Sequence, residues 1–180
     1  MGVGYDEEAA SLSATTSNIL PSSRCRDCPL YDRLRFFVPK DKRSPEKAEI
    51  AIVLEAPGER EVVAGRPAVG AAGRELDHLL KDAGIPRETV LVTNVLKCQP
   101  EGNKLPDDLQ LAIDCCSEIV RDDIKDAKVI VGMGNVPLKA FTGLTHITVR
   151  RGSVYRLPDS RPFVASVHPS FLVRSKFMKV

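Results

Sequence analysis

The sequence predicts an α/β fold, a three-layer α/β/α sandwich built around a central, mostly parallel sheet of four strands. Short runs of β-branched and aliphatic residues alternate along the chain with segments whose apolar residues recur at helical spacing. The short runs are apolar throughout, as is typical of strands buried on both faces of a parallel sheet. Because helices separate these strands, we expect helices to cover both faces of the sheet.

The first strand and the first helix are predicted by residues 49–84. The run Glu49–Leu54 is β-branched and apolar and ends at Ala56-Pro57-Gly58, which predicts a strand followed by a turn. The segment 70–83 has its apolar residues at helical spacing, which predicts a helix. Gly84 as a C-cap, with Pro86 beyond it, ends this helix.

The middle of the chain repeats the alternation. Val90–Thr93 predicts the second strand, and the apolar positions of 109–124 predict a helix with one buried face. Val129–Val131 predicts the third strand. The segment Gly132-Met133-Gly134 lacks the third glycine of a dinucleotide-binding fingerprint, so we interpret it as close packing between this strand and a short helix over 136–141. The fourth predicted strand is Phe163–Val167.

Length and composition indicate one domain. The chain has 180 residues, of which 43% are hydrophobic and 28% are charged, as in ordinary globular domains. We assign residues 24–180 to this domain and residues 1–23 to a flexible or helical lead. The apolar runs fall far short of the roughly 20 residues of a membrane span. Acids at positions 6–8, where a secretory signal carries bases, favour a cytoplasmic protein.

The charge is unevenly distributed. The net charge is only +2, but residues 149–180 contain seven bases and one acid, whereas 107–126 contain seven acids and two bases. A basic C-terminal surface on an acidic body suits a nucleic-acid partner, and an ordinary solvated surface is the alternative interpretation.

Five cysteines suggest a metal centre. An odd number in a reducing compartment argues against a disulfide framework. The pair Cys25 and Cys28 forms a CxxC motif, which serves redox chemistry, zinc or an iron–sulfur cluster. Its place between a Ser/Thr-rich segment and a loop-like basic stretch favours metal ligation. Cys98 with Cys115 or Cys116 completes four thiolates, and the remaining cysteine is a buried spare.

The strand ends carry the candidate site. In parallel sheets the ligand lies at the carboxyl ends of the strands. Polar residues follow three of the four predicted strands, and they are the segment Glu55–Glu61, Asn94 and His168.

Several ordered motifs then resemble those of the family 4 uracil-DNA glycosylases. They are Glu55–Glu61, Gly65–Gly70 with Ala72–Arg74, Thr93–Cys98, Gly102-Asn103 and His168–Arg174. The resemblance runs from Cys25 to Arg174 and includes the cysteine spacing. It implies a monomeric hydrolase that acts on uracil-containing DNA in base excision repair. It also implies a 4Fe-4S cluster on Cys25, Cys28, Cys98 and Cys115, with Cys115 chosen over Cys116 because its distance from Cys98 is nearer the family's.

The resemblance also implies roles at the base. A flipped uracil needs an acceptor for N3–H and a donor for O4, and the Asn94 amide supplies both. Ala56 and Ala68 correspond to other residues of the base pocket. His168 corresponds to a histidine that donates to O2, where negative charge develops as uracil leaves.

Further roles concern water and DNA. Glu55 and Glu61 correspond to family glutamates that position water, sugar or neighbouring groups. Ser170 and Arg174 resemble the segment that enters the duplex beside the flipped base, and Arg151 is a candidate phosphate contact.

Two positions depart from the family. Leu54 stands where the family has glycine, and Ala68 stands where it has a phenylalanine that stacks on uracil. The alternative function is therefore a retargeted or catalytically weak DNA-binding protein of the same fold that carries the cluster.

Overall fold

The computed structural model describes residues 21–174, so residues 1–20 of the predicted lead lie outside it. Its five-stranded sheet has the order β2-β1-β3-β5-β4. The strands are β1 (Ile50–Leu54), β2 (Val90–Asn94), β3 (Val129–Met133), β4 (Val154–Arg156) and β5 (Pro162–Ser166). None of the helices in residues 21–174 is both long and apolar enough to cross a membrane.

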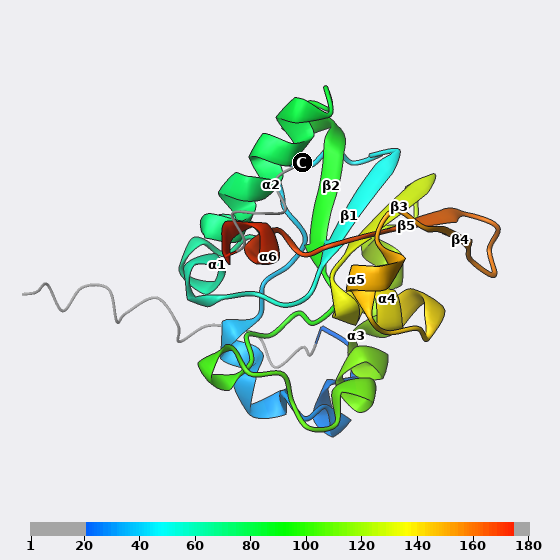
Figure 1. Cartoon of the computed structure of the whole chain (residues 1–180). Helices are drawn as coiled ribbons and strands as arrows, with labels where there is room; N and C mark the ends of the chain where they lie inside the picture. The colour runs from blue at the N-terminus through cyan, green and yellow to red at the C-terminus, as the bar shows by residue number, and fades with distance from the viewer. Residues whose placement is uncertain (1–20, 175–180) are drawn as a thin grey trace, which may run out of the picture.

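Helices surround the sheet (Figure 1). The α-helices are α1 (Glu59–Ala64), α2 (Ala71–Asp82), α3 (Leu109–Asp123), α4 (Asn135–Thr142), α5 (Ile147–Arg150) and α6 (Pro169–Arg174). The 3-10 helices are η2 (Ser23–Asp27), η3 (Tyr31–Phe36), η4 (Arg87–Thr89) and η5 (Glu101–Asn103). The predicted α/β fold is confirmed.

The four predicted strands are the parallel part of the sheet. β1 pairs in parallel with β2 and β3, and β3 pairs in parallel with β5. The sheet has a fifth strand, β4, which pairs antiparallel with β5 at the edge. The predicted count of four is therefore one too low. β4 is only three residues long, and Val154 and Arg156 on it are exposed, so it has no buried apolar run to reveal it.

Alternate side chains of β1 belong to two different apolar cores. Ala51 and Val53 pack in the larger apolar cluster, with residues of α3 and α4. Ile52 and Leu54 pack in the smaller cluster, with residues of α2. Because successive side chains of a strand point to opposite faces, each face of the sheet has its own core. This is the three-layer arrangement that the sequence predicts.

The end of β3 and the turn into α4 pack closely against side chains of β5 and of the segment after it. A side chain at Gly132 would meet the Phe163 ring on β5 at 2.1 Å, so only glycine fits there. Gly134 has a φ of 108°, which other residues rarely adopt, and it lies against His168. The Gly132 contact is thus with the neighbouring strand β5 and not with α4, whereas Gly134 is the N-cap of α4.

The segment after β1 contains a helix that the sequence pattern does not reveal. Residues 59–64 form α1, with Glu59 and Arg60 exposed, where we expected only a turn and loop. Its apolar residues are too few to show helical spacing. Glu61 instead stabilises the start of the helix, because its carboxylate accepts the Gly58 N–H at 3.2 Å.

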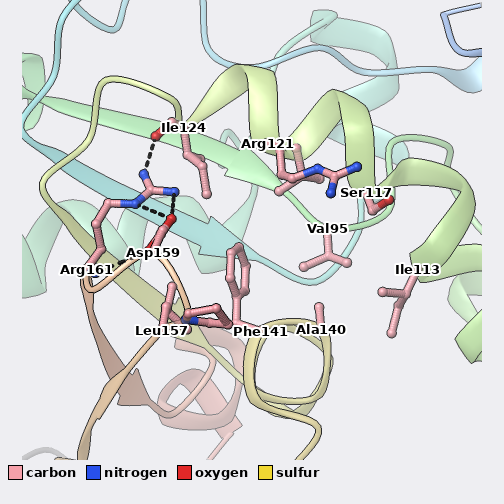
Figure 2. Close-up of a pocket in the computed structure, with 12 residues that line it drawn as sticks. Val95, Ile113, Ser117, Arg121, Ile124, Ala140, Phe141, Leu157, Asp159 and Arg161 are labelled. Atoms are coloured by element: carbon pink, nitrogen blue, oxygen red, sulfur yellow. Dashed lines mark hydrogen bonds and ion pairs between the residues drawn. The ribbon is translucent and has the colours of Figure 1, made fainter.

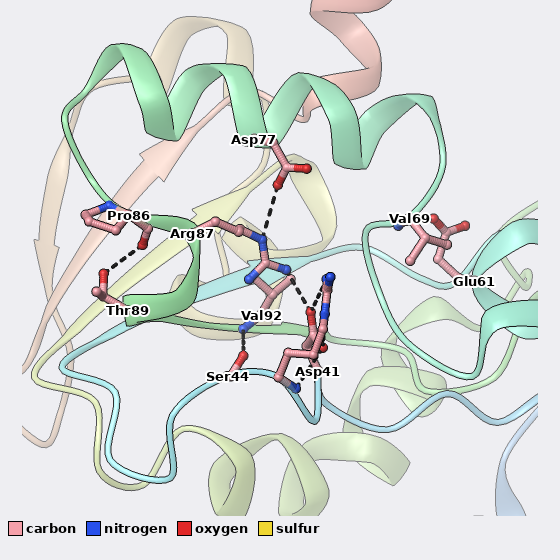
Figure 3. Close-up of polar contacts among 10 residues, drawn as sticks. Asp41, Ser44, Glu61, Val69, Asp77, Pro86, Arg87, Thr89 and Val92 are labelled. Carbon is pink, nitrogen blue, oxygen red and sulfur yellow. Dashed lines mark hydrogen bonds and ion pairs between the residues drawn. The ribbon is translucent and has the colours of Figure 1, made fainter.

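A buried carboxylate joins the segment before β1 to η4 and, through Arg87, to α2. The Asp41 side chain is fully buried and accepts hydrogen bonds from Arg43 and Arg87, at 3.0 and 2.9 Å. Arg87 also reaches Asp77 on α2 at 3.3 Å (Figure 3). Burial raises the pKa of Asp41, but the bonds and charges of the two guanidiniums outweigh it and lower this pKa overall. The carboxylate is thus held ionised inside the fold.

Candidate functional site

The carboxyl ends of four strands meet at one edge of the sheet. Leu54 at the end of β1 pairs in register with Asn94 at the end of β2. Met133 at the end of β3 pairs with Ser166 at the end of β5, shortly before His168. The structure therefore brings to one edge the strand-end residues Glu55, Asn94 and His168.

Asn94 carries an unused hydrogen-bond donor at this edge. The residue is 2% exposed, and its Nδ2 has no hydrogen-bond partner within residues 21–174. A buried polar atom left without a partner costs roughly 1–3 kcal/mol. The amide is thus positioned to donate to a ligand that enters beside β1 and β2.

Glu61 lies in the same region, but its carboxylate is occupied by the backbone. It accepts the N–H groups of Gly58, Val69 and Gly70 at 3.2, 2.9 and 2.7 Å. Gly70 is the N-cap of α2. Glu61 therefore fixes the loop between α1 and α2, including Ala68.

Ala68 is held in an unusual conformation in this loop. It has a φ of 56° and is 9% exposed. A side chain at Gly73 would meet the Ala68 carbonyl oxygen at 2.0 Å, so the loop lies directly on α2. Ala68 and Leu54 belong to the same buried apolar cluster. The two departures from the family thus lie in one core.

His168 is a neutral histidine with a defined tautomer. Its Nδ1 accepts the Ser170 N–H at 3.2 Å and lies 2.8 Å from Ser170 Oγ. Burial and the Arg174 charge lower the pKa of His168 to about 4, against a smaller opposite effect of Glu61. Because Nδ1 accepts a hydrogen bond from the Ser170 N–H, the proton of the neutral ring lies on Nε2, which is available as a donor.

Arg174 links the first and last strand ends. Its guanidinium donates to Ser170 Oγ at 3.4 Å. Burial raises the pKa of the Glu55 carboxyl, and the Arg174 charge partly opposes this shift. Glu55, His168 and Arg174 therefore lie within electrostatic reach of one another.

Two predicted residues contribute less to this arrangement. Ala56 follows Glu55 and packs against the larger core without a polar contact. Arg151 is exposed after α5 and donates to the Thr148 carbonyl at 3.0 Å. In the described part of the chain, Arg151 makes no hydrogen bond or ion pair with Asn94 or His168.

A buried network behind Asn94 was not predicted. Lys97 is 1% exposed, and its ammonium bonds Thr93 Oγ1 and Asp123 Oδ2. Thr93 also donates to Asp123 Oδ2 at 2.7 Å, which joins the end of β2 to α3. A lysine inside the apolar run Val95–Cys98 was the available signal. This network fixes the backbone on which Asn94 stands.

All five cysteines line one cavity. Its walls are completed by Lys97 and by the apolar or aromatic residues Leu30, Tyr31, Leu34, Phe37 and Ile119. CxxC lies on η2 and its cap, which pack against α3 (Figure 1). Cys28 Sγ accepts the Leu30 N–H at 3.4 Å, a contact that favours a thiolate.

The donor set suits an iron–sulfur cluster. Across residues 21–174, no group of three or more His, Cys, Asp or Glu side chains has the arrangement of a metal-ion site. A cluster contains several metal atoms, so it takes its thiolates at wider separations than a single ion does. Thiolates are the usual ligands of such clusters, and the apolar walls of this cavity shield them from water.

A second cavity lies away from the strand ends. It has a volume of about 360 Å³ and is lined by α3, α4 and the β4–β5 hairpin (Figure 2). Arg161 on its wall pairs with Asp159 at 2.7 Å and donates to the Ile124 carbonyl, also at 2.7 Å. None of the predicted site residues lines it.

The fold and the site together define an α/β protein of the class that binds its ligand outside the carboxyl ends of parallel strands. The family model of the uracil DNA glycosylase superfamily matches residues 42–180. The chain therefore belongs to the uracil DNA glycosylase superfamily, and the resemblance seen in its motifs is confirmed.

Individual proteins similar to this chain support the same family assignment. The type-4 uracil-DNA glycosylase of Thermotoga maritima is 33% identical over 156 residues, or 85% of this chain and 80% of that protein. The type-4 enzyme of Archaeoglobus fulgidus is 37% identical over 155 residues, or 81% of this chain and 76% of that protein. A DNA polymerase of Bacillus phage SP01 is 33% identical over 149 residues, which make up 79% of this chain but 16% of the polymerase.

Proposed function

We propose that the protein is a uracil-DNA glycosylase, a hydrolase that removes uracil from DNA to start base excision repair. The observation that carries the proposal is the buried Asn94 amide, whose Nδ2 has no partner within residues 21–174. The type-4 relatives, named as uracil-DNA glycosylases, support the same reaction.

Asn94 recognises the flipped base. Nδ2 donates to uracil O4, and Oδ1 accepts the N3–H. Cytosine has an amine in place of O4 and no N3–H, so both contacts become unfavourable. The backbone at Asn94 is held in place because Lys97 and Asp123 bond the side chain of the preceding residue, Thr93. This fixed position supports the discrimination between uracil and cytosine.

His168 stabilises the departing base. As the bond between C1′ and N1 breaks, negative charge develops on uracil, chiefly at O2. A donor aimed at O2 stabilises this state more than the ground state. The low pKa of His168, about 4, keeps the ring neutral near pH 7, with Nε2–H free to donate.

Glu55 positions the attacking water. Water adds to C1′ of the sugar, its proton is released, and the uracil anion takes up a proton. Burial raises the pKa of Glu55, which strengthens it as a proton acceptor once it is ionised. Glu61 is a positioning residue, since its carboxylate already accepts three backbone N–H groups.

DNA binds at the same edge of the sheet, where the carboxyl ends of the parallel strands lie. Ser170 and Arg174 on α6 enter the duplex beside the flipped base, and Arg151 contacts a phosphate. Backbone amides and guanidiniums set the register on DNA but do not read its sequence. We also expect a monomeric, cytoplasmic enzyme, and both properties remain predictions from the sequence.

A 4Fe-4S cluster on Cys25, Cys28, Cys98 and one thiol of the pair at 115 and 116 completes the proposal. When bound, such a cluster serves here as a structural crosslink. Its ligands come from η2, from the segment after β2 and from α3, so it ties the start of the described chain to the domain.

Excision assays on an oligonucleotide with a single uracil test the proposal. We expect protein loaded with iron to create an abasic site, seen as an alkali-cleaved strand on a denaturing gel, while a thymine control stays intact. If the loaded protein binds this DNA and leaves the uracil strand intact, the proposal fails. The alternative, a DNA-binding protein without excision, then holds.

A further inference from the structure

Two arginines of η3 stack on one aromatic ring. The guanidinium carbons of Arg33 and Arg35 lie over the Phe36 ring, 4.2 and 4.6 Å from its centroid. A guanidinium that stacks on a ring uses its flat face, so the N–H donors along its edge stay free for hydrogen bonds. The ring therefore holds two sets of donors in place on η3.

These two positive charges have no carboxylate partner in the described part of the chain. The ion pairs formed there involve other arginines and lysines, and the exposed Asp32 pairs with neither arginine. Within residues 21–174, Arg33 Nε donates to the Gln99 carbonyl at 3.2 Å, and the Arg35 guanidinium donates to no other residue. Like charges held together without a counter-charge oppose folding, and such exceptions are expected at functional sites.

The surface around this pair is basic. Residues 24–43 contain seven bases and three acids. One of the three acids, Asp41, is buried and already paired with Arg43 and Arg87. Exposed guanidiniums with free N–H edges suit an anion whose oxygens accept two parallel hydrogen bonds, and a phosphate is such an anion.

Contacts of the segment after β2 connect η3 to the candidate site. This segment runs along the end of β1, where the Glu55 carbonyl accepts the Leu96 N–H at 3.0 Å. Farther on, Gln99, the residue that η3 contacts, donates from Nε2 to Asn103 Oδ1 at 3.2 Å. Asn103 Oδ1 also lies 4.0 Å from the place of a Cβ atom at Gly58. η3 and η5 thus lie side by side, next to the loop that follows β1 (Figure 1).

We propose that Arg33 and Arg35 bind a backbone phosphate of the DNA, outside the flipped nucleotide. DNA that binds at the strand ends reaches η3 by passing over η5, since η5 lies between Gly58 and η3. The contact fixes the position of the DNA and reads no sequence. The inference rests on the proposed function in one respect, namely that the substrate is DNA.

Neutral phosphates locate such a contact. A methylphosphonate replaces one phosphate at a time on either side of a 2′-fluorinated deoxyuridine, which resists excision because fluorine destabilises positive charge on the sugar. Fluorescence anisotropy measures Kd for each DNA. We expect wild type to lose about 10-fold in affinity at the contacted phosphate. Arg35→Gln should bind unmodified DNA about 10-fold more weakly and no longer respond to the neutral phosphate at that position.

A matched variant and the unfolding midpoint serve as controls. Lys47→Gln removes an exposed base before the amino end of β1, away from the strand ends, and should keep the wild-type Kd and the wild-type response. Arg35→Gln should unfold at the wild-type temperature, because its guanidinium forms no hydrogen bond within residues 21–174. Arg33→Gln should repeat the binding result, and Arg35→Gln alone decides if loss of the bond to Gln99 leaves Arg33→Gln insoluble.

The outcomes separate this site from the proposed function. If Arg35→Gln binds unmodified DNA as tightly as wild type, or responds to every neutral phosphate as wild type does, the phosphate site is overturned. If wild type binds DNA but leaves uracil in place in the excision assay, the proposed function fails. The binding measurements then still decide whether Arg35 contacts a phosphate.

Discussion

Asn94 and His168 show how single residues carry the site. Among residues 21–174, the fold leaves the Asn94 Nδ2 atom without a partner and keeps His168 uncharged by burial. Both conditions oppose stability, because a free donor and a neutralised base each cost free energy on folding. Residues that break the local rules of stable folding are expected at functional sites.

His168 makes stability depend on pH. Its folded pKa of about 4 lies below the ordinary value of 6.5, so the unfolded chain binds a proton that the folded protein does not. Stability from this residue is complete above pH 6.5 and falls as pH decreases toward 4. We expect wild type to lose about 2 kcal/mol relative to His168→Gln between pH 7 and pH 5. Urea unfolding of both proteins measures this, and parallel pH curves would contradict it.

We expect Ala68 and Leu54 to act as a pair, because β1 and the loop before α2 contribute them to one buried cluster. Both are buried in one cluster, so Ala68→Phe alone overfills it at a φ of 56°. We expect that variant to lose about 1–3 kcal/mol of stability without gaining activity. Leu54→Gly with Ala68→Phe makes room for the ring, and stacking on uracil should then raise excision about 10-fold or more.

Thermal unfolding and single-turnover excision of the two single variants and the double variant measure both effects. The single variant Leu54→Gly is the control, because it opens the cluster without supplying a ring. Higher activity in Ala68→Phe alone would show that the two positions are independent.

Asp41 connects the segment before β1 to η4 and, through Arg87, to α2. Its loss should therefore lower the free energy of unfolding of the domain. Asp41→Asn leaves Arg43 and Arg87 without their carboxylate, and we expect a loss of about 3 kcal/mol at pH 7. Asp159→Asn breaks a pair with Arg161 whose carboxylate side chain is 50% exposed, and should cost below about 1 kcal/mol. The free energies of unfolding of the two variants and wild type are measured by urea unfolding.

The pH dependence of this difference has a definite sign. The pKa of Asp41 is lowered in the fold, so its contribution is present above the unfolded pKa of 3.8 and decreases as pH falls through the folded value. If Asp41→Asn and Asp159→Asn lose the same free energy of unfolding at pH 7, the burial of Asp41 does not strengthen its ion pairs.

Elements with long buried runs were predictable, and short exposed ones were not. β1, β2, β3 and β5 have nearly continuous apolar sequences, so their presence and their parallel pairing could be predicted. β4 and α1 lack such runs. α1 depends on Glu61 reaching back to Gly58 and forward to Gly70, a contact that only the folded loop creates.

For the whole molecule, the strand-end rule located Glu55, Asn94 and His168, because parallel topology alone brings them together. The rule could not show that Glu61 is occupied by backbone N–H groups. Nor could spacing choose between Cys115 and Cys116, since the direction of each side chain depends on how α3 is rotated against the sheet.

The distribution of basic residues over the molecule, rather than its net charge, should govern DNA binding. The net charge is only +2, so affinity depends on the local bases rather than on the overall field. We expect Arg151→Gln to reduce the slope of log Kd against log salt by about 1, equally for DNA with and without uracil. Fluorescence anisotropy over a salt series measures this, with exposed Lys125→Gln on the acidic side as the control. An unchanged slope would remove Arg151 from the DNA interface.

Excision by wild type and Asn94→Leu, measured in single turnovers on oligonucleotides with uracil or cytosine at one position, is the most direct test of the strand-end site. We predict that wild type releases uracil and leaves cytosine. Asn94→Leu should be slower by about 100-fold or more, and its thermal stability should be equal or higher because the unpartnered amide is gone. Equal rates for the two proteins, or no release by wild type with its cluster, would contradict the proposed role of Asn94.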